Sequence, residues 1–188
     1  MTTPTHEAGV LAVLARAQDE GALGARPVDE VLAHARSFVA ALPSGVSTVL
    51  DMGTGAGVPG LVIALDRPEI CVVMVDRRAK RVDSLQRAIV SLGWSDRVQA
   101  IEADADLLSR DPQHHHTYDA VVARGFAEPL VALPIAVRLT RPGGWVIISE
   151  PPPERGSRWD TEWVQTLGVA APERLGSVVR FHVEQPGE

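Results

Sequence analysis

The sequence is poor in thiols and amines, since its 188 residues include one cysteine, Cys71, and one lysine, Lys80. A single cysteine leaves no disulfide framework, as is usual for proteins of the reducing cytoplasm, and we expect a cytoplasmic location. Cys71 lies inside the apolar run 70–75, so we expect a buried and unreactive thiol. All other Lys and Arg positions are arginines, and we assign no function to this preference.

Long hydrophobic runs are missing as well. No apolar run approaches the ~20 residues that a membrane-spanning helix needs. Residues 1–7 lack the basic start and the apolar segment of a secretory signal, and we expect no membrane association. The net charge of −6 argues against a non-specific coat for nucleic acids, although it leaves room for a local basic patch.

The remaining composition is that of a globular protein, with 45% hydrophobic residues and a mean hydropathy of +0.04. We expect residues 1–188 to form a single domain. Apolar residues at helical spacing predict helices over 7–20 and 28–42, so that residues 1–45 form a helical N-terminal extension. Residues 46–188 then hold a sheet.

Apolar strands and amphipathic helices alternate after residue 46. This alternation predicts an α/β fold with a doubly wound, mostly parallel sheet, which binds ligands at the carboxyl ends of its strands. The predicted strands are 47–51, 70–75, 97–102, 118–123, 145–149 and 178–183, with one more strand possible in the tail. The predicted helices after the extension are 58–66, 78–92, 127–139 and 159–167.

The stretch Asp51-Met-Gly-Thr-Gly-Ala-Gly-Val-Pro-Gly60 follows the first strand and has glycines at alternate positions. Part of it fits the dinucleotide pattern G-x-G-x-x-G, a weak match by itself. A pyrophosphate seeks bare N–H groups at a helix start, and a carboxylate at the mouth of the loop repels it. Asp51 therefore favours a cationic ligand, such as the ammonium and sulfonium of S-adenosylmethionine.

Acids also follow the second and third strands. Asp76 ends strand 70–75, where a carboxylate accepts hydrogen bonds from ribose hydroxyls in either cofactor class. Asp104 and Asp106 follow the third strand and are candidates to hold an adenine. The alternative for these two is an acidic helix start, stabilised by the helix dipole.

These residues together resemble a class I S-adenosylmethionine-dependent methyltransferase. The Val58-Pro59-Gly60 extension, Lys80-Arg81 and an arginine directly after strand 118–123 resemble one family more narrowly. It is the small-subunit ribosomal RNA guanine-N7 methyltransferase G family, also called glucose-inhibited division protein B. The resemblance implies a seven-stranded Rossmann-like sheet with an antiparallel last strand, and methyl transfer to N7 of a guanine in ribosomal RNA.

By the same resemblance, the glycines line the methionine, Asp76 the ribose and Asp104–Asp106 the adenine. The partner is then ribosomal RNA or the small ribosomal subunit, and no metal is implied. Arg124 lies on the substrate side and is the candidate catalytic residue. The predicted cofactor residues are Asp51, Gly53, Thr54, Gly55, Ala56, Gly57, Pro59, Asp76, Arg77, Asp104, Ala105, Asp106 and Arg124.

Departures from the family pattern lie on the substrate side. Ser149-Glu150-Pro151 stands where the family has a Lys-Gly pair, which replaces a cation with an acid. His34-Ala35-Arg36 holds the family's Arg-His pair out of register. Two alternatives therefore stay open: a methyltransferase for a small molecule or a protein, and a module that binds the cofactor without turnover.

Methyl transfer to guanine N7 needs alignment rather than a general base, because the neutral base carries an available lone pair. We find no catalytic triad. Arg124 is suited to stack on a base, pair with guanine O6 or bind a phosphate; its structural alternative is an ion pair with Glu128 or Asp119. A basic patch that joins Arg124, Arg36 and Arg77–Arg81 would favour RNA.

Other conspicuous residues receive structural interpretations or open alternatives. The cations at the start of helix 78–92 oppose the helix dipole, which suits a polyanion or the cofactor, or else they form a solvated basic face. His114–His116 are adjacent and cannot converge on one metal ion, so we expect no functional metal. Trp145 is expected to pack, while Trp159 and Trp163 share one helix face that covers the sheet or meets a partner.

Overall fold

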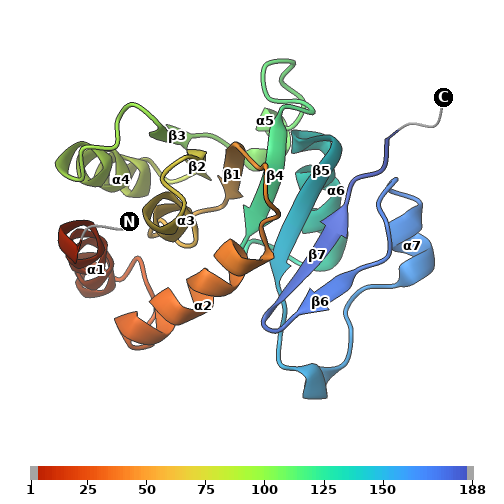
Figure 1. Ribbon diagram of the computed structural model, residues 1–188, viewed down its shortest axis with the longest axis horizontal. Coiled ribbons are helices and arrows are strands. Elements are labelled where there is room, and N and C mark those ends of the chain that lie inside the picture. The colour runs from red at the N-terminus through yellow and green to blue at the C-terminus, as the bar shows by residue number, and fades with distance from the viewer. Residues whose placement is uncertain (1–3, 186–188) are drawn as a thin grey trace.

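The computed structural model describes residues 4–185, which form a seven-stranded sheet in the order β3-β2-β1-β4-β5-β7-β6 (Figure 1). The five strands from β3 to β5 are parallel to their neighbours, and β7 is antiparallel to both β5 and β6. The predicted doubly wound sheet with a reversed last strand is therefore confirmed. The strands are β1 (Thr48–Met52), β2 (Cys71–Asp76), β3 (Val98–Glu102), β4 (Tyr118–Ala123), β5 (Thr140–Ser149), β6 (Glu173–Leu175) and β7 (Val178–His182).

Four helices pack on one face of the sheet and three on the other, with a separate apolar cluster under each layer (Figure 1). The first layer holds α1 (Pro4–Asp19), α2 (Val28–Ala41), α3 (Gly60–Asp66) and α4 (Ala79–Ser91). The second layer holds α5 (Ala105–Leu108), α6 (Pro129–Leu139) and α7 (Thr161–Gln165), and a short 3₁₀ helix covers Pro153–Arg155.

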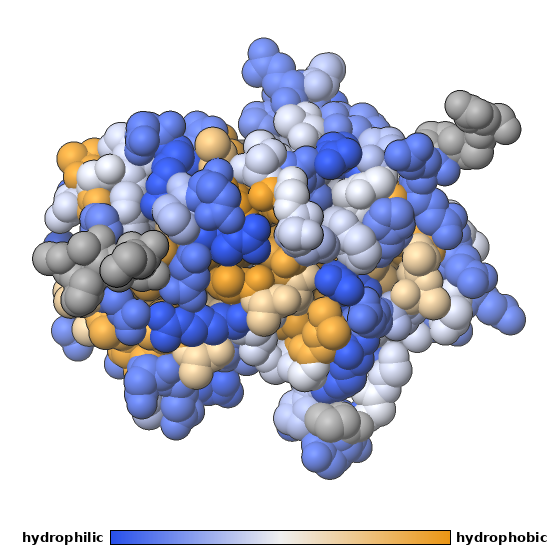
Figure 2. All heavy atoms as spheres, in the orientation of Figure 1, coloured by the Kyte–Doolittle hydropathy of each residue, from blue (hydrophilic) through white to orange (hydrophobic). Residues whose placement is uncertain are grey.

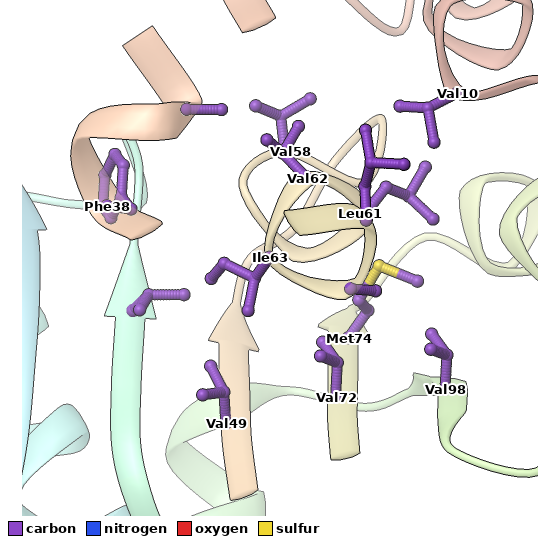
Figure 3. Packing of buried hydrophobic residues seen from close by; sticks show 14 of the residues in the cluster. Val10, Phe38, Val49, Val58, Leu61, Val62, Ile63, Val72, Met74 and Val98 are labelled. Carbon is purple, nitrogen blue, oxygen red and sulfur yellow. The ribbon is translucent and has the colours of Figure 1, made fainter. Parts of the chain in front are cut away.

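Helix α3 is the centre of the first layer, because all of its residues from Gly60 to Leu65 are buried. Its side chains meet Phe38 of α2, Val10 of α1 and the inward side chains of β1 and β2 (Figure 3). Burial of each such apolar side chain contributes about 1.5–3 kcal/mol. The glycine-rich stretch between β1 and α3 is thus anchored at both ends in the core.

The helical N-terminal extension is part of the core. Val10 and Leu14 of α1 and Phe38 of α2 are fully buried. Helix α1 approaches the end of α4 closely, since a Cβ at Gly9 would lie 2.7 Å from Leu92. Beside this contact, the rings of His6 and Trp94 lie 5.7 Å apart.

Two sequence predictions about the strands need correction. Cys71 is exposed, not buried, because it is the first residue of β2 and the covering helices protect only the residues after it. Strand β5 begins at Thr140 rather than at 145, since Thr140 already pairs with Tyr118 across a bulge in the ladder. Both differences lie at the amino end of the parallel strands, opposite the predicted site.

Asp119 fastens this amino end. Its carboxylate accepts hydrogen bonds from the backbone N–H groups of Ser47 and Thr48 and from the guanidinium of Arg141. Burial opposes ionisation of Asp119, but the hydrogen bonds from Ser47 and the other donors outweigh it, and the pKa of the carboxyl lies well below its usual range. Asp119 is therefore committed to the starts of β1 and β5 and is not a partner for Arg124.

Candidate functional site

The glycine-rich loop leaves β1 at Met52 and turns back over the carboxyl ends of β1 and β2. The N–H of Thr54 donates to the carbonyl of Val75, which ties the loop to the neighbouring strand. Gly53 and Gly57 have φ values of +71° and +90°, in the left-handed region that disfavours side chains. A Cβ at Gly57 would also lie 2.6 Å from Leu61 and 2.7 Å from Leu85, so the loop fits tightly on the core.

Asp51 lies beneath this loop and not at its mouth, because its exposed fraction is 0%. Its Oδ2 accepts hydrogen bonds from the Thr54 hydroxyl at 2.6 Å and from the Gly60 N–H at 2.8 Å. Its Oδ1 is buried with no hydrogen-bond partner. Burial raises the pKa of Asp51 to about 6, although the bonds from Thr54 and Gly60 and the charge of Arg124 act the other way.

The position of Asp51 corrects one step of the sequence argument. The carboxylate braces the turn from below, and its charge reaches the surface of the loop through a medium of low polarity. Such a charge is incompletely compensated, and a cation above the loop stabilises it. The preference for a cationic ligand therefore rests on the field of Asp51 rather than on a direct contact.

Asp76 is buried at the end of β2, beside the loop. Its oxygens accept hydrogen bonds from the N–H groups of Gly55 at 3.0 Å and Arg78 at 2.9 Å, and from the Arg81 guanidinium at 3.3 Å. An ionised carboxylate accepts about four hydrogen bonds. One further acceptor position is therefore left for a hydroxyl group of a ligand.

Asp104 and Asp106 have different surroundings after β3. Asp104 is exposed and caps α5, where its side chain accepts from the N–H groups of Asp106 and Leu107. The Asp106 carboxylate is held by Arg138 at 2.6 Å and by Arg110 at 2.7 Å. Helix capping thus describes Asp104 alone, whose second oxygen stays available, whereas the Asp106 carboxylate is committed to two arginines.

Arg124 follows β4 and has no ion pair within the described residues. Neither Glu128 nor Asp119 pairs with it, so the structural alternative from the sequence is not realised. Its guanidinium is half-buried and interacts electrostatically with Asp51, Arg26 and His34. A desolvated arginine with spare donors, near the glycine loop, is available to a substrate.

Two further residues lie near the site: His34, noted above only as part of the displaced Arg-His pair, and Phe126, which no sequence motif singled out. Burial and then the charges of Arg124 and Arg26 lower the pKa of His34, whose buried Nδ1 has no hydrogen-bond partner. A Cβ at Gly53 would lie 2.4 Å from the Phe126 ring, so this ring covers the start of the loop. Phe126 lies two residues after Arg124 in the loop that follows β4. This closeness to a predicted site residue is the signal that could have identified Phe126 as a site residue from the sequence.

The acid that replaces the family's Lys-Gly pair does not face the site. The Glu150 side chain is 2% exposed, and it accepts from the Trp159 indole N–H and from Arg158. These contacts join the two ends of the segment 150–159. The predicted helix 159–167 is shorter in the structure, where α7 covers Thr161–Gln165. Trp159 precedes this helix and packs on Phe181, with a distance of 4.8 Å between the ring centroids.

The remaining predicted residues divide into buried and exposed ones. Thr54, Ala56, Pro59 and Ala105 are buried in the loop or at the start of α5, while Arg77 is exposed beside Asp76. The peptide bond before Pro59 is cis. Arg36 does not join a basic patch with Arg124, because it forms ion pairs with Asp66 and Glu7 at 2.9 Å each.

The histidines of the 114–116 turn serve local structure. His114 contacts the Tyr118 hydroxyl, and the rings of His115 and His116 contact the carbonyl oxygens of Ser109 and Thr140. Over residues 4–185, no group of three or more His, Cys, Asp or Glu side chains is placed to hold a metal ion. No helix in the same part of the chain is long and apolar enough to cross a membrane.

The strand order, the reversed β7, the glycine loop after β1 and the acid after β2 together define the class I methyltransferase fold. A solved O-methyltransferase of neocarzinostatin biosynthesis, in complex with S-adenosylmethionine and a naphthoic acid, shares this fold. Its TM-score is 0.61 at 16% sequence identity, with coverage of 79% of this chain and 52% of that chain.

Sequence comparison narrows the class to one family. The GidB family model, described as rRNA small subunit methyltransferase G, matches residues 14–165, and the chain belongs to this family. The Desulfitobacterium hafniense ribosomal RNA small subunit methyltransferase G is 39% identical over 53% of this chain and 41% of its own length. The Roseiflexus castenholzii protein of the same name is 34% identical over 75% of this chain and 58% of its own. The chain thus spans about half the length of these relatives.

Proposed function

We propose that this chain is an S-adenosylmethionine-dependent methyltransferase that acts on N7 of a guanine in small-subunit ribosomal RNA. The observation that carries the proposal is the unpartnered, buried Oδ1 of Asp51 beneath a glycine loop, in a chain of the GidB family. Its charge suits a cationic cofactor and opposes a pyrophosphate. The proposal extends to this chain a substrate class that the names of its full-length relatives state for those proteins.

The residues present fit the cofactor. The negative charge of Asp51 favours the ammonium and sulfonium groups of the cofactor. The one acceptor position left on Asp76 suits a ribose hydroxyl. Backbone at Gly53 and Gly55, together with Asp104, lines the rest of the carboxyl edge. When bound, S-adenosylmethionine supplies a methyl group that its sulfonium already activates.

Arg124 is the proposed substrate-binding and catalytic residue. Its guanidinium is available to pair with O6 of guanine or to stack on the base, either of which fixes N7 in line with the loop. No proton needs to leave the nucleophile, so positioning supplies the catalysis. The buried position of Glu150 supports an RNA acceptor, because the acid in place of the family's Lys-Gly pair does not repel phosphates at the surface.

Methyl transfer to purified small ribosomal subunits, to free small-subunit RNA and to total RNA, from a labelled cofactor, tests this function. We expect label in N7-methylguanine after nuclease digestion and mass spectrometry. Arg124→Ala is expected to lower kcat/KM by about 100-fold, because Arg124 acts on the acceptor. Arg67→Ala is the control, because Arg67 pairs with Glu69 before the start of β2, at the end of the sheet away from the predicted site residues. Absence of label in all RNA samples refutes the proposed substrate.

A further inference from the structure

A groove of about 910 Å³ separates α1 from α4 and reaches the glycine loop at Gly55 and Ala56. The two helices approach closely at Gly9 and Leu92, and the groove between this contact and the loop is lined by residues of both helices. In Figure 1 α4 lies beside α1, and Figure 2 shows hydrophilic and hydrophobic residues interleaved on this face. The groove is distinct from the acceptor side, where Arg124 lies.

The groove combines an apolar floor with a basic rim. Small and aliphatic side chains from both helices form the floor, and the rim carries five basic residues against one acid, Glu20. This excess is unusual in a chain of net charge −6. The floor consists of Val13, Ala17, Leu85 and Ala88; the rim cations are Arg16, Arg78, Lys80, Arg81 and Arg87.

Three of the five rim cations have no ion pair among the described residues. Arg16 pairs with Glu20 and Arg81 with Asp76, whereas Arg78, Lys80 and Arg87 are exposed and form no salt bridge there. Arg78 and Lys80 also stand at the N-terminus of α4, whose first turn has no acid and no side-chain cap. Cations at this end oppose the helix dipole, so an anion bound there relieves an unfavourable arrangement.

We propose that the α1–α4 groove binds a segment of the RNA strand that lies outside the methylated nucleotide. Arg78, Lys80 and Arg87 hold its phosphates, and a base rests on the floor formed by Ala17, Leu85 and Ala88. RNA is favoured over a free nucleotide because the groove is open and its cations extend over several turns of α4, which suits a run of phosphates. The inference rests on the proposed function and adds a second contact surface to it.

The test compares RNA affinity with cofactor affinity in the full chain. The paired substitution Arg78→Glu/Lys80→Glu is expected to weaken binding of transcribed small-subunit RNA roughly 10- to 100-fold at low salt. The slope of log K against log salt should fall by about 1.4, because about 0.7 is lost per phosphate contact on a single strand. Calorimetry should give an unchanged cofactor dissociation constant, since neither side chain is among the predicted cofactor residues.

Matched variants separate the groove from general electrostatics. Arg67→Glu/Arg174→Glu changes the net charge equally at positions outside the groove and outside the predicted cofactor residues, and it should leave RNA affinity within about twofold. Ala17→Trp fills the floor without a change of charge and should weaken RNA binding, with folding checked by circular dichroism. An equal loss of RNA affinity in the control, or a loss of cofactor affinity with RNA affinity kept, overturns the proposal.

This proposal and the proposed function fail separately. If the wild-type chain binds RNA through the groove but places no label on guanine N7, the methylation site is wrong and the groove stands. If labelling occurs and Arg78→Glu/Lys80→Glu methylates free RNA with unchanged KM, the groove proposal is wrong. Free adenosine monophosphate as competitor completes the test, because displacement of RNA at micromolar concentration would assign the groove to a mononucleotide instead.

Discussion

At the scale of single residues, Gly55 and Gly57 share a left-handed backbone but differ in surroundings. Gly57→Ala adds a methyl group against Leu61 and Leu85, while the nearest atom to a Cβ at Gly55 is the mobile end of Arg81 at 3.6 Å. We expect Gly55→Ala to cost about 1–2 kcal/mol of unfolding free energy from backbone strain. Gly57→Ala should cost about 2–5 kcal/mol, because overpacking adds to this strain. Urea unfolding of the two variants measures the difference, and equal costs would contradict it.

Asp51 makes stability depend on pH. Its pKa rises from 3.8 in the unfolded chain to about 6 in the fold, so the folded state holds the proton more tightly. The folded state therefore loses stability as pH rises from about 4 to 6, by up to ~3 kcal/mol. Asp51→Asn keeps an acceptor for Thr54 and Gly60 and should remove this loss. Unfolding free energies at pH 4, 5, 6 and 7 for both proteins test this, and parallel curves would refute it.

The sequence predicted which residues gather at the site better than what each side chain does there. Asp51, Asp76 and Arg124 lie at the carboxyl ends of three neighbouring parallel strands, so strand direction alone brings them to one edge. The burial of a side chain cannot be read from its position in a strand in the same way. The orphaned oxygen of Asp51 and the covering ring of Phe126 depend on how the loop packs on α3 and β4, and this packing involves residues far apart in the chain.

At the scale of elements, the segment 150–159 is held by one buried acid. Glu150→Gln keeps an acceptor for the Trp159 indole but removes the ion pair with Arg158. We expect a loss of about 1.5–3 kcal/mol, as for hydrogen bonds to charged groups, felt mainly by this segment. Hydrogen exchange should quicken at 154–158, the part of the segment after the prolines that carries amide protons, and stay unchanged in β1 and β2. Faster exchange throughout the sheet would show that the segment is not a separate unit.

Element boundaries reveal where sequence patterns stop being informative. The apolar strands and the amphipathic α2 and α4 were predicted to within a few residues, because a core face leaves a periodic signal. The start of β5 and the start of the tail helix were missed. Thr140–Gly144 reads as a turn yet extends a strand, and Trp159 reads as helical yet is held before α7 by Glu150.

At the scale of the whole molecule, one cooperative unit remains a prediction. Both apolar clusters are built on opposite faces of the same central strands, so neither layer of helices has a sheet of its own to fold on. Far-UV circular dichroism reports mostly on helices, and fluorescence reports on four tryptophans, three of them after residue 140. We expect coincident urea midpoints from the two probes. Leu14→Ala should lower the free energy of unfolding by about 2–5 kcal/mol, and by the same amount whichever probe is used. Divergent midpoints would indicate two units.

The exposed Cys71 and the exposed Lys80 are two unique reactive side chains that allow site-specific labelling. Each is the sole member of its type, so a maleimide dye labels one position and an amine-reactive footprinting reagent reports on one side chain besides the terminal amine. Cys71 begins β2 and Asp76 ends it, so a dye is carried about 16 Å from the site edge. Lys80 stands on the groove itself. The natural sequence can therefore be labelled for anisotropy and for footprinting without any substitution.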